Sequence, residues 1–267
     1  MFVNRVWQQH FGTGLAATPD NLGVTGAKPT HPELLDYLAA EFVQSGWRLK
    51  SLHRLLVTSA TYRQSGTLRE SAYTIDPENK LLWRFPLQRL DAESVRDAIL
   101  SASGELNLAI GGPYVPTKAN SDSQVVVEET NAGAKRRSLY LQQRRTQPLT
   151  MLDVFDTARM NPNCTRRNPS TVSLQSLALL NSDFMRARSR AFAHRLEKEC
   201  GPDNNQRLGR AFLLTLGRKP NPAERSAAEE FLRSQATHYA DQPDKDQRVW
   251  TDLCQMVLAG NAFLYVE

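Results

Sequence analysis

Apolar residues recur at helical spacing along almost the whole chain, and this periodicity constrains the fold more than any other feature of the sequence. After Thr30-His31-Pro32-Glu33, a predicted capping box, one helical face carries Leu34, Leu35, Leu38 and Phe42. Further segments of this kind are bounded by glycine, proline or asparagine, including one recapped at Asn221-Pro222-Ala223-Glu224. The sequence therefore predicts a mainly α, multi-helix globular fold.

Only two stretches have the composition of strands. Ser123 to Thr130 contains three consecutive valines, and Arg137 to Gln142 follows after the turn-forming residues 131–134. We therefore expect one small β-hairpin at about residues 123–142.

A chain of 267 residues can form one large domain or two modest ones. We expect a main helical domain at residues 1–200, with the hairpin inserted in it. Residues 201–267 are predicted to form a C-terminal helical hairpin and a closing helix that pack on this domain and do not fold independently.

The first predicted helix starts at the beginning of the chain with a large apolar face and no N-cap. That face carries Val3, Val6, Trp7 and Phe11. We expect this chain to be the C-terminal portion of a longer protein, with the face packed against an N-terminal neighbour.

The composition argues against several kinds of site. The three cysteines are far apart without a CxxC motif, which excludes a covalently attached c-type haem and argues against a cysteine zinc site. The five histidines form neither HxH nor HExxH, so no metal or other cofactor is expected. No apolar run has the length of a membrane span, and no signal peptide opens the chain.

The segment from Lys135 to Asp183 concentrates charge within an apolar frame and contains the candidate site. A long loop at residues 157–170 leads to a helix expected to begin near Thr171, whose free N–H groups and dipole would favour an anion. The predicted anion site consists of Arg166, Arg167, Ser170, Thr171 and Ser173.

The alternative is structural, and we favour it. Asp153 and Asp156 lie three positions apart on a predicted helix, where they can pair with arginines and hold the loop in place. The available arginines are Arg144, Arg145, Arg166 and Arg167. Two acids on one helical turn do not flank a substrate from opposite sides as in glycoside hydrolysis, so no catalytic residue is assigned.

Several stretches of the sequence resemble the planctomycete-specific domain of unknown function 1553 family. They are NRVWQQHFGTGL, HPELLDYLAAEFV, LKSLHRLLVTSATYRQS, RLDAESVRDAIL, RRSLYL, STVSLQSLALLNS, LGRKPNPAE and DLCQMVLAGNAFLYVE. The resemblance covers almost the whole chain in the expected order. Two departures are Thr157 to Met160, where the family often has an Asp-rich segment, and Ala262, where it tends to have an acid.

The resemblance implies a C-terminal domain of long exported proteins, periplasmic or on the cell surface. Such proteins commonly carry a cytochrome-c-like haem domain and a second planctomycete-specific domain before it. These N-terminal domains are the expected partners. The family has no established activity.

Three function classes remain open. The first, which we favour, is a non-catalytic scaffold or interaction module of a larger exported protein. The second is a binding module for an anionic, sulfated or carboxylated glycan. The third is part of a polysaccharide-active enzyme whose site the N-terminal domains complete, although for this chain alone we lean against an enzyme. Nucleic-acid binding is disfavoured, because acids are interspersed among the basic clusters and no known binding module is present.

Overall fold

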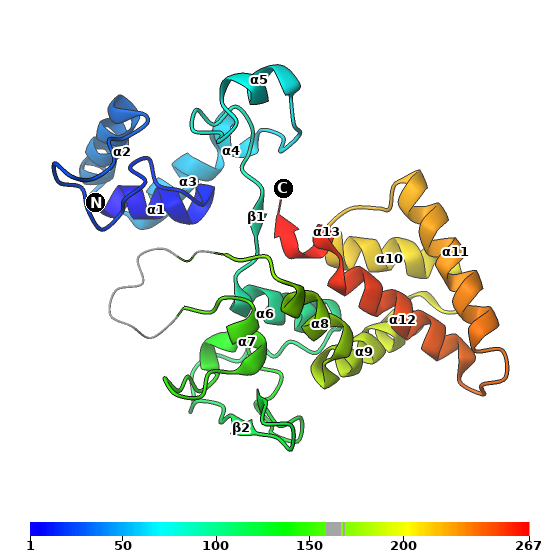
Figure 1. The fold of residues 1–267 in the computed structure, drawn as a ribbon. Helices are drawn as coiled ribbons and strands as arrows, with labels where there is room; N and C mark the ends of the chain where they lie inside the picture. The colour runs from blue at the N-terminus through cyan, green and yellow to red at the C-terminus, as the bar shows by residue number, and fades with distance from the viewer. Residues whose placement is uncertain (159–166, 168, 267) are drawn as a thin grey trace. The chain divides into compact units, whose positions relative to one another are not determined.

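The computed structural model describes residues 1–158, 167 and 169–266 (Figure 1). Across these residues the chain forms thirteen α-helices, one 3-10 helix and four two-residue strands. The mainly helical fold predicted from the sequence is therefore confirmed. The chain divides into two compact units, Met1–Gln88 with the last residues from Tyr265, and Arg89–Leu264.

This boundary after Gln88 was not expected from the sequence. It falls within β1 (Gln88–Arg89), while β4 (Tyr265–Val266) closes the described chain. The division expected near residue 200 falls inside the second unit, where residues on both sides of it pack together.

The first unit is helical. Its helices are α1 (Phe2–Phe11), α2 (Pro32–Gln44), α3 (Leu49–Val57), α4 (Ala60–Arg63) and α5 (Glu70–Ile75). The capping box predicted at Thr30 is wrong, since α2 has His31 as its N-cap and no side-chain cap. The backbone N–H of Thr30 instead donates to the carbonyl of Leu15 at 2.9 Å, which places Thr30 outside the helix.

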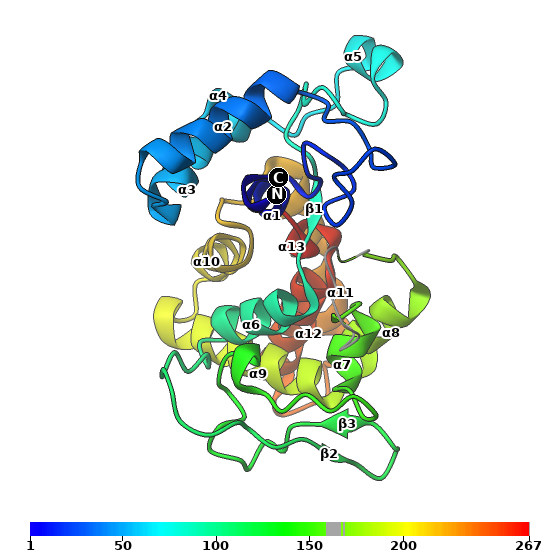
Figure 2. The ribbon, with the colours of Figure 1, turned by 90° about the vertical axis from the view of Figure 1, so that its left-hand side faces the viewer.

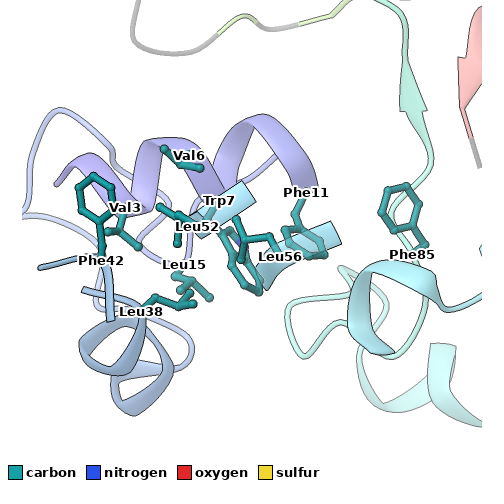
Figure 3. Packing of buried hydrophobic residues seen from close by; sticks show 10 residues of the cluster. All are labelled: Val3, Val6, Trp7, Phe11, Leu15, Leu38, Phe42, Leu52, Leu56 and Phe85. Atoms are coloured by element: carbon teal, nitrogen blue, oxygen red, sulfur yellow. The ribbon is translucent and has the colours of Figure 1, made fainter. Parts of the chain in front are cut away.

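The core of the first unit is built on α1 (Figure 3). Val3, Val6, Trp7 and Phe11 are all buried there. They share one cluster with Leu38, Phe42, Leu52 and Leu56 of α2 and α3. The apolar face that we assigned to an N-terminal neighbour is therefore covered by this chain's own helices, and it no longer supports such a partner.

A buried asparagine fastens the segment after α1. The Asn4 side chain is fully buried, its Nδ2 donates to the carbonyl of Ala16 at 2.9 Å, and its Oδ1 accepts from the N–H of Ala16 at 2.9 Å. A Cβ on Gly14 would lie 2.6 Å from this Asn4 Nδ2. Gly14 is thus required by close packing.

Two histidines join α1 to α3. His10 Nε2 and His53 Nδ1 are 2.7 Å apart, a hydrogen bond that needs one proton between the two nitrogens. The Tyr62 ring meets the edge of His10 with a centroid distance of 5.7 Å. Burial lowers the pKa of His10, and the charge of His53 lowers it further.

This pair predicts a loss of stability in acid. Because the folded-state pKa of His10 is lowered, the unfolded chain binds the proton more readily once the pH falls below the usual histidine value of about 6.5. We expect the free energy of unfolding to decrease between about pH 7 and pH 5, and His10→Gln to make this decrease shallower. Urea unfolding of the full chain across this range measures it. His194→Gln, on a side chain 70% exposed, is the control, and an unchanged pH slope in His10→Gln would contradict the prediction.

The second unit holds the remaining helices, and α9 and α12 pack along each other within it (Figures 1 and 2). Phe192 and Leu196 of α9, with Leu253 and Leu258 of α12, are fully buried. The predicted capping box at Asn221 is present, with the side chains of Asn221 and Glu224 each bonded to the other's backbone N–H. The helices are α6 (Ala92–Ala102), α7 (Thr150–Val154), α8 (Ser173–Asn181), α9 (Asp183–Cys200), α10 (Asn204–Leu216), α11 (Pro222–His238), α12 (Lys245–Ala259) and α13 (Asn261–Leu264).

The small hairpin exists, but its second predicted strand is wrong. β2 (Lys118–Ala119) pairs antiparallel with β3 (Val125–Val126), so the partner of the valine stretch precedes it in the sequence. Within the predicted second strand, the 3-10 helix η1 (Ser138–Tyr140) forms instead. The physical cause is α6, because the hydroxyl and N–H of Ser138 donate to Asp97 Oδ1 at 2.7 and 2.8 Å and hold this segment against that helix.

Candidate functional site

The predicted site residue Arg167 has partners inside the second unit. Its Nη1 lies 2.5 Å from Glu93 Oε2 and 3.7 Å from Asp91 Oδ2, and its Nη2 donates to Glu93 Oε1 at 3.3 Å. Burial acts to raise the pKa of Glu93, but the hydrogen bonds and charge of Arg167 outweigh it and lower that pKa. Arg167 is therefore joined to the first turn of α6. Arg166 lies outside the described residues.

Asp156 binds Ser170, fourteen positions later in the chain. Ser170 donates to it twice, from N–H to Oδ2 at 2.7 Å and from Oγ to Oδ1 at 2.8 Å. Burial acts to raise the pKa of Asp156, but the hydrogen bonds from Ser170 and Arg89 overcome this and lower it. A structural role for Asp156 was expected from the sequence, but the arginine that it binds was not among the four candidates. Most of the loop expected at residues 157–170 lies outside the described residues.

That arginine is Arg89, whose side chain is only 4% exposed. Its Nη2 lies 2.7 Å from Asp156 Oδ2 and also donates to the carbonyl of Phe155 at 3.2 Å. Its Nη1 donates to Gln175 Oε1 at 3.1 Å and to the carbonyl of Ser170. No local pattern marks Arg89, because these partners lie 66 to 86 positions later in the chain.

The start of α8 differs from the capped helix that we predicted. Val172 occupies the N-cap position without a side-chain hydrogen bond, and Ser173 is the first helical residue. Thr171 and Ser173 are exposed, while Arg167 and Ser170 are engaged with acids of the chain itself. The anion site at this helix start stays a prediction.

A cleft of about 430 Å³ opens beside α7, within the segment that the sequence singled out. Buried Leu141, Leu149 and Leu152 form its apolar floor. Its remaining lining residues are Gln142, Gln143, Arg144, Arg145, Pro148, Asp153, Thr157 and Ala158. Three residues that we expected to pair structurally, Arg144, Arg145 and Asp153, thus border one concave surface.

The expected pairing of Asp153 with Arg144 is not formed. Arg144 is exposed and its Nη1 donates to the neutral Gln147 Oε1 at 3.4 Å. Asp153 is also exposed, and the ion pairs among the described residues leave its carboxylate without a cationic partner. The sequence left open which of the four arginines pairs with Asp153, and Arg144 donates to Gln147.

Among the described residues, no three side chains of His, Cys, Asp or Glu gather in a group that could hold a metal ion. Cys200 and Cys254 are free thiols, and burial raises the pKa of the Cys254 thiol, which keeps it protonated and unreactive. Cys164 lies outside the described residues. Within the described part of the chain, no helix combines the length and apolarity needed to cross a bilayer.

A family model described as PSD1, protein of unknown function (DUF1553), matches residues 1–232. The chain belongs to the DUF1553 family. No curated protein and no solved structure matches it. The cleft beside α7 and the contacts of Asp156 both lie within the matched part of this DUF1553 chain.

Proposed function

We propose that this DUF1553 chain is a binding module for an anionic glycan, sulfated or carboxylated, which it holds in the cleft beside α7. The observation that carries the proposal is an apolar floor bordered by two adjacent arginines, Arg144 and Arg145. The volume of about 430 Å³ is within the range of ligand pockets. Guanidinium groups bind carboxylate or sulfate through paired hydrogen bonds, and the leucine floor can receive the apolar faces of sugar rings.

Recognition without catalysis fits the lining better than hydrolysis does. Among the described lining residues, Asp153 is the one carboxylate, whereas glycoside hydrolysis uses two carboxyl groups on opposite sides of the bond. The resemblance implies that this module is part of a larger exported protein. There the N-terminal domains, including a cytochrome-c-like domain, would be its partners and could supply an activity.

The first test removes the two arginines of the cleft. We expect Arg144→Gln with Arg145→Gln to weaken binding of dextran sulfate and polygalacturonate at least tenfold, because hydrogen bonds to charged groups contribute about 1.5–3 kcal/mol each. Titration calorimetry on the full chain measures this affinity. A salt concentration of about 0.15 M screens nonspecific attraction between the charged polymer and the protein. Neutral dextran should not bind.

A matched control separates the cleft from general positive charge. Arg186→Gln with Arg233→Gln makes the same change in net charge on side chains that are 62% and 73% exposed. Their ion-pair partners, Asp183 and Glu230, lie outside the cleft. Equal weakening by the two double variants would mean nonspecific attraction and would overturn the proposed function.

A further inference from the structure

The cleft beside α7 carries two opposite charges that do not neutralise each other. Arg144 and Asp153 both line it, and the Arg144 side chain bonds to Gln147 while the Asp153 carboxylate has no cation among the described residues. Asp153 is held in place by its helix, since its N–H donates to the carbonyl of Leu149 at 2.9 Å and the adjacent Leu152 is buried. The backbone of Asp153 is therefore fixed at the rim of the cleft, and its side chain is exposed there.

This arrangement is poorly suited to a simple oxyanion. Sulfate or phosphate would be attracted to the arginines but repelled by the carboxylate bordering the same cleft. An ionised carboxylate only accepts hydrogen bonds, so a ligand that displaces water from it must offer donors in return. Sugar hydroxyls are such donors, and their bonds to a carboxylate are charge-assisted.

Building on the proposed function, we infer that Asp153 is the specificity residue of the cleft, selecting an acidic sugar over a bare oxyanion. The acidic group of the ligand binds at Arg144 and Arg145. The hydroxyls of the same sugar unit donate to Asp153, and its apolar ring face lies over the leucine floor. The ligand thus satisfies both charges of the cleft at once, which neither free sulfate nor a neutral sugar does.

The test compares two probes whose affinities should move in opposite directions. Removing the carboxylate in Asp153→Ala should weaken binding of D-glucuronate about tenfold, the effect of losing a hydrogen bond to a charged group. The same variant should bind inorganic sulfate about twofold more tightly, because a repelling charge is gone. Both affinities can be followed on the full chain by NMR titration at constant ionic strength, with D-glucose as the neutral probe.

Asp241→Ala serves as the matched control, since it removes an exposed aspartate that does not line the cleft. It should leave the ratio of glucuronate to sulfate affinity unchanged. If Asp153→Ala also leaves that ratio unchanged while the arginine variant abolishes glucuronate binding, the inference is overturned and the proposed function stands. If the wild type binds neither anionic probe and no sulfated or carboxylated glycan, both are overturned.

Discussion

Replacement of Arg89 by methionine is expected to lower the free energy of unfolding of the second unit by about 3 kcal/mol. The variant keeps the apolar stem but removes the cation that lies 2.7 Å from Asp156 Oδ2. It also leaves the carbonyls of Phe155 and Ser170 without the Arg89 donor. This loss of stability should be at the lower end of the range for breaking a buried ion pair. The reason is that Asp156 is 26% exposed and keeps its two hydrogen bonds from Ser170. Urea unfolding monitored by circular dichroism measures it.

The control for Arg89 is an arginine in a surface ion pair. Arg233 is 73% exposed and pairs with Glu230, so Arg233→Met should change the stability by less than about 1 kcal/mol. A double-mutant cycle of Arg89→Met with Asp156→Asn should show a coupling above about 0.5 kcal/mol, because the two side chains touch. Similar small losses in Arg89→Met and Arg233→Met would show that the contacts of Arg89 with Asp156 and Ser170 do not stabilise this unit.

Trp7→Ala is expected to destabilise the first unit by about 3–5 kcal/mol, as for other large aromatic residues truncated in a core. Trp7 is 4% exposed and its ring stacks on Phe11 with a centroid distance of 4.1 Å. The loss is a large part of the roughly 5–15 kcal/mol that stabilises a typical protein. Thermal and urea unfolding of the full chain should therefore show an earlier transition for this unit.

Trp47→Ala is the matched control, because it removes the same side chain from an exposed position. Trp47 is 66% exposed and meets Phe42 edge to face with a centroid distance of 5.4 Å. That contact accounts for about 0.5–1.5 kcal/mol. If the two tryptophan variants were equally destabilised, the core in Figure 3 would not be the main source of stability of this unit.

The sequence indicates where the candidate site lies but not which residues contact each other there. It singled out Arg144, Arg145 and Asp153, which the structure brings to one cleft, and Asp156 and Arg167, which the structure gives other partners. The missing partners, Arg89 and Glu93, stand more than sixty positions away, and a single sequence carries no signal linking such positions.

The sequence by itself determined the helical class, the capping box at Asn221 and the burial of the apolar face of α1. Each depends on interactions within a few positions along the chain or on the preference of apolar side chains to leave water. Only the tertiary structure decided what covers that face, because many apolar surfaces compete for it and α2 and α3 of the same chain occupy it. The tertiary structure also decided which arginine binds Asp156, because Arg89 reaches it from a distant part of the sequence. It decided where the hairpin forms as well, because the hydrogen bond from Ser138 to Asp97 outweighs the local strand preference of the segment around Ser138.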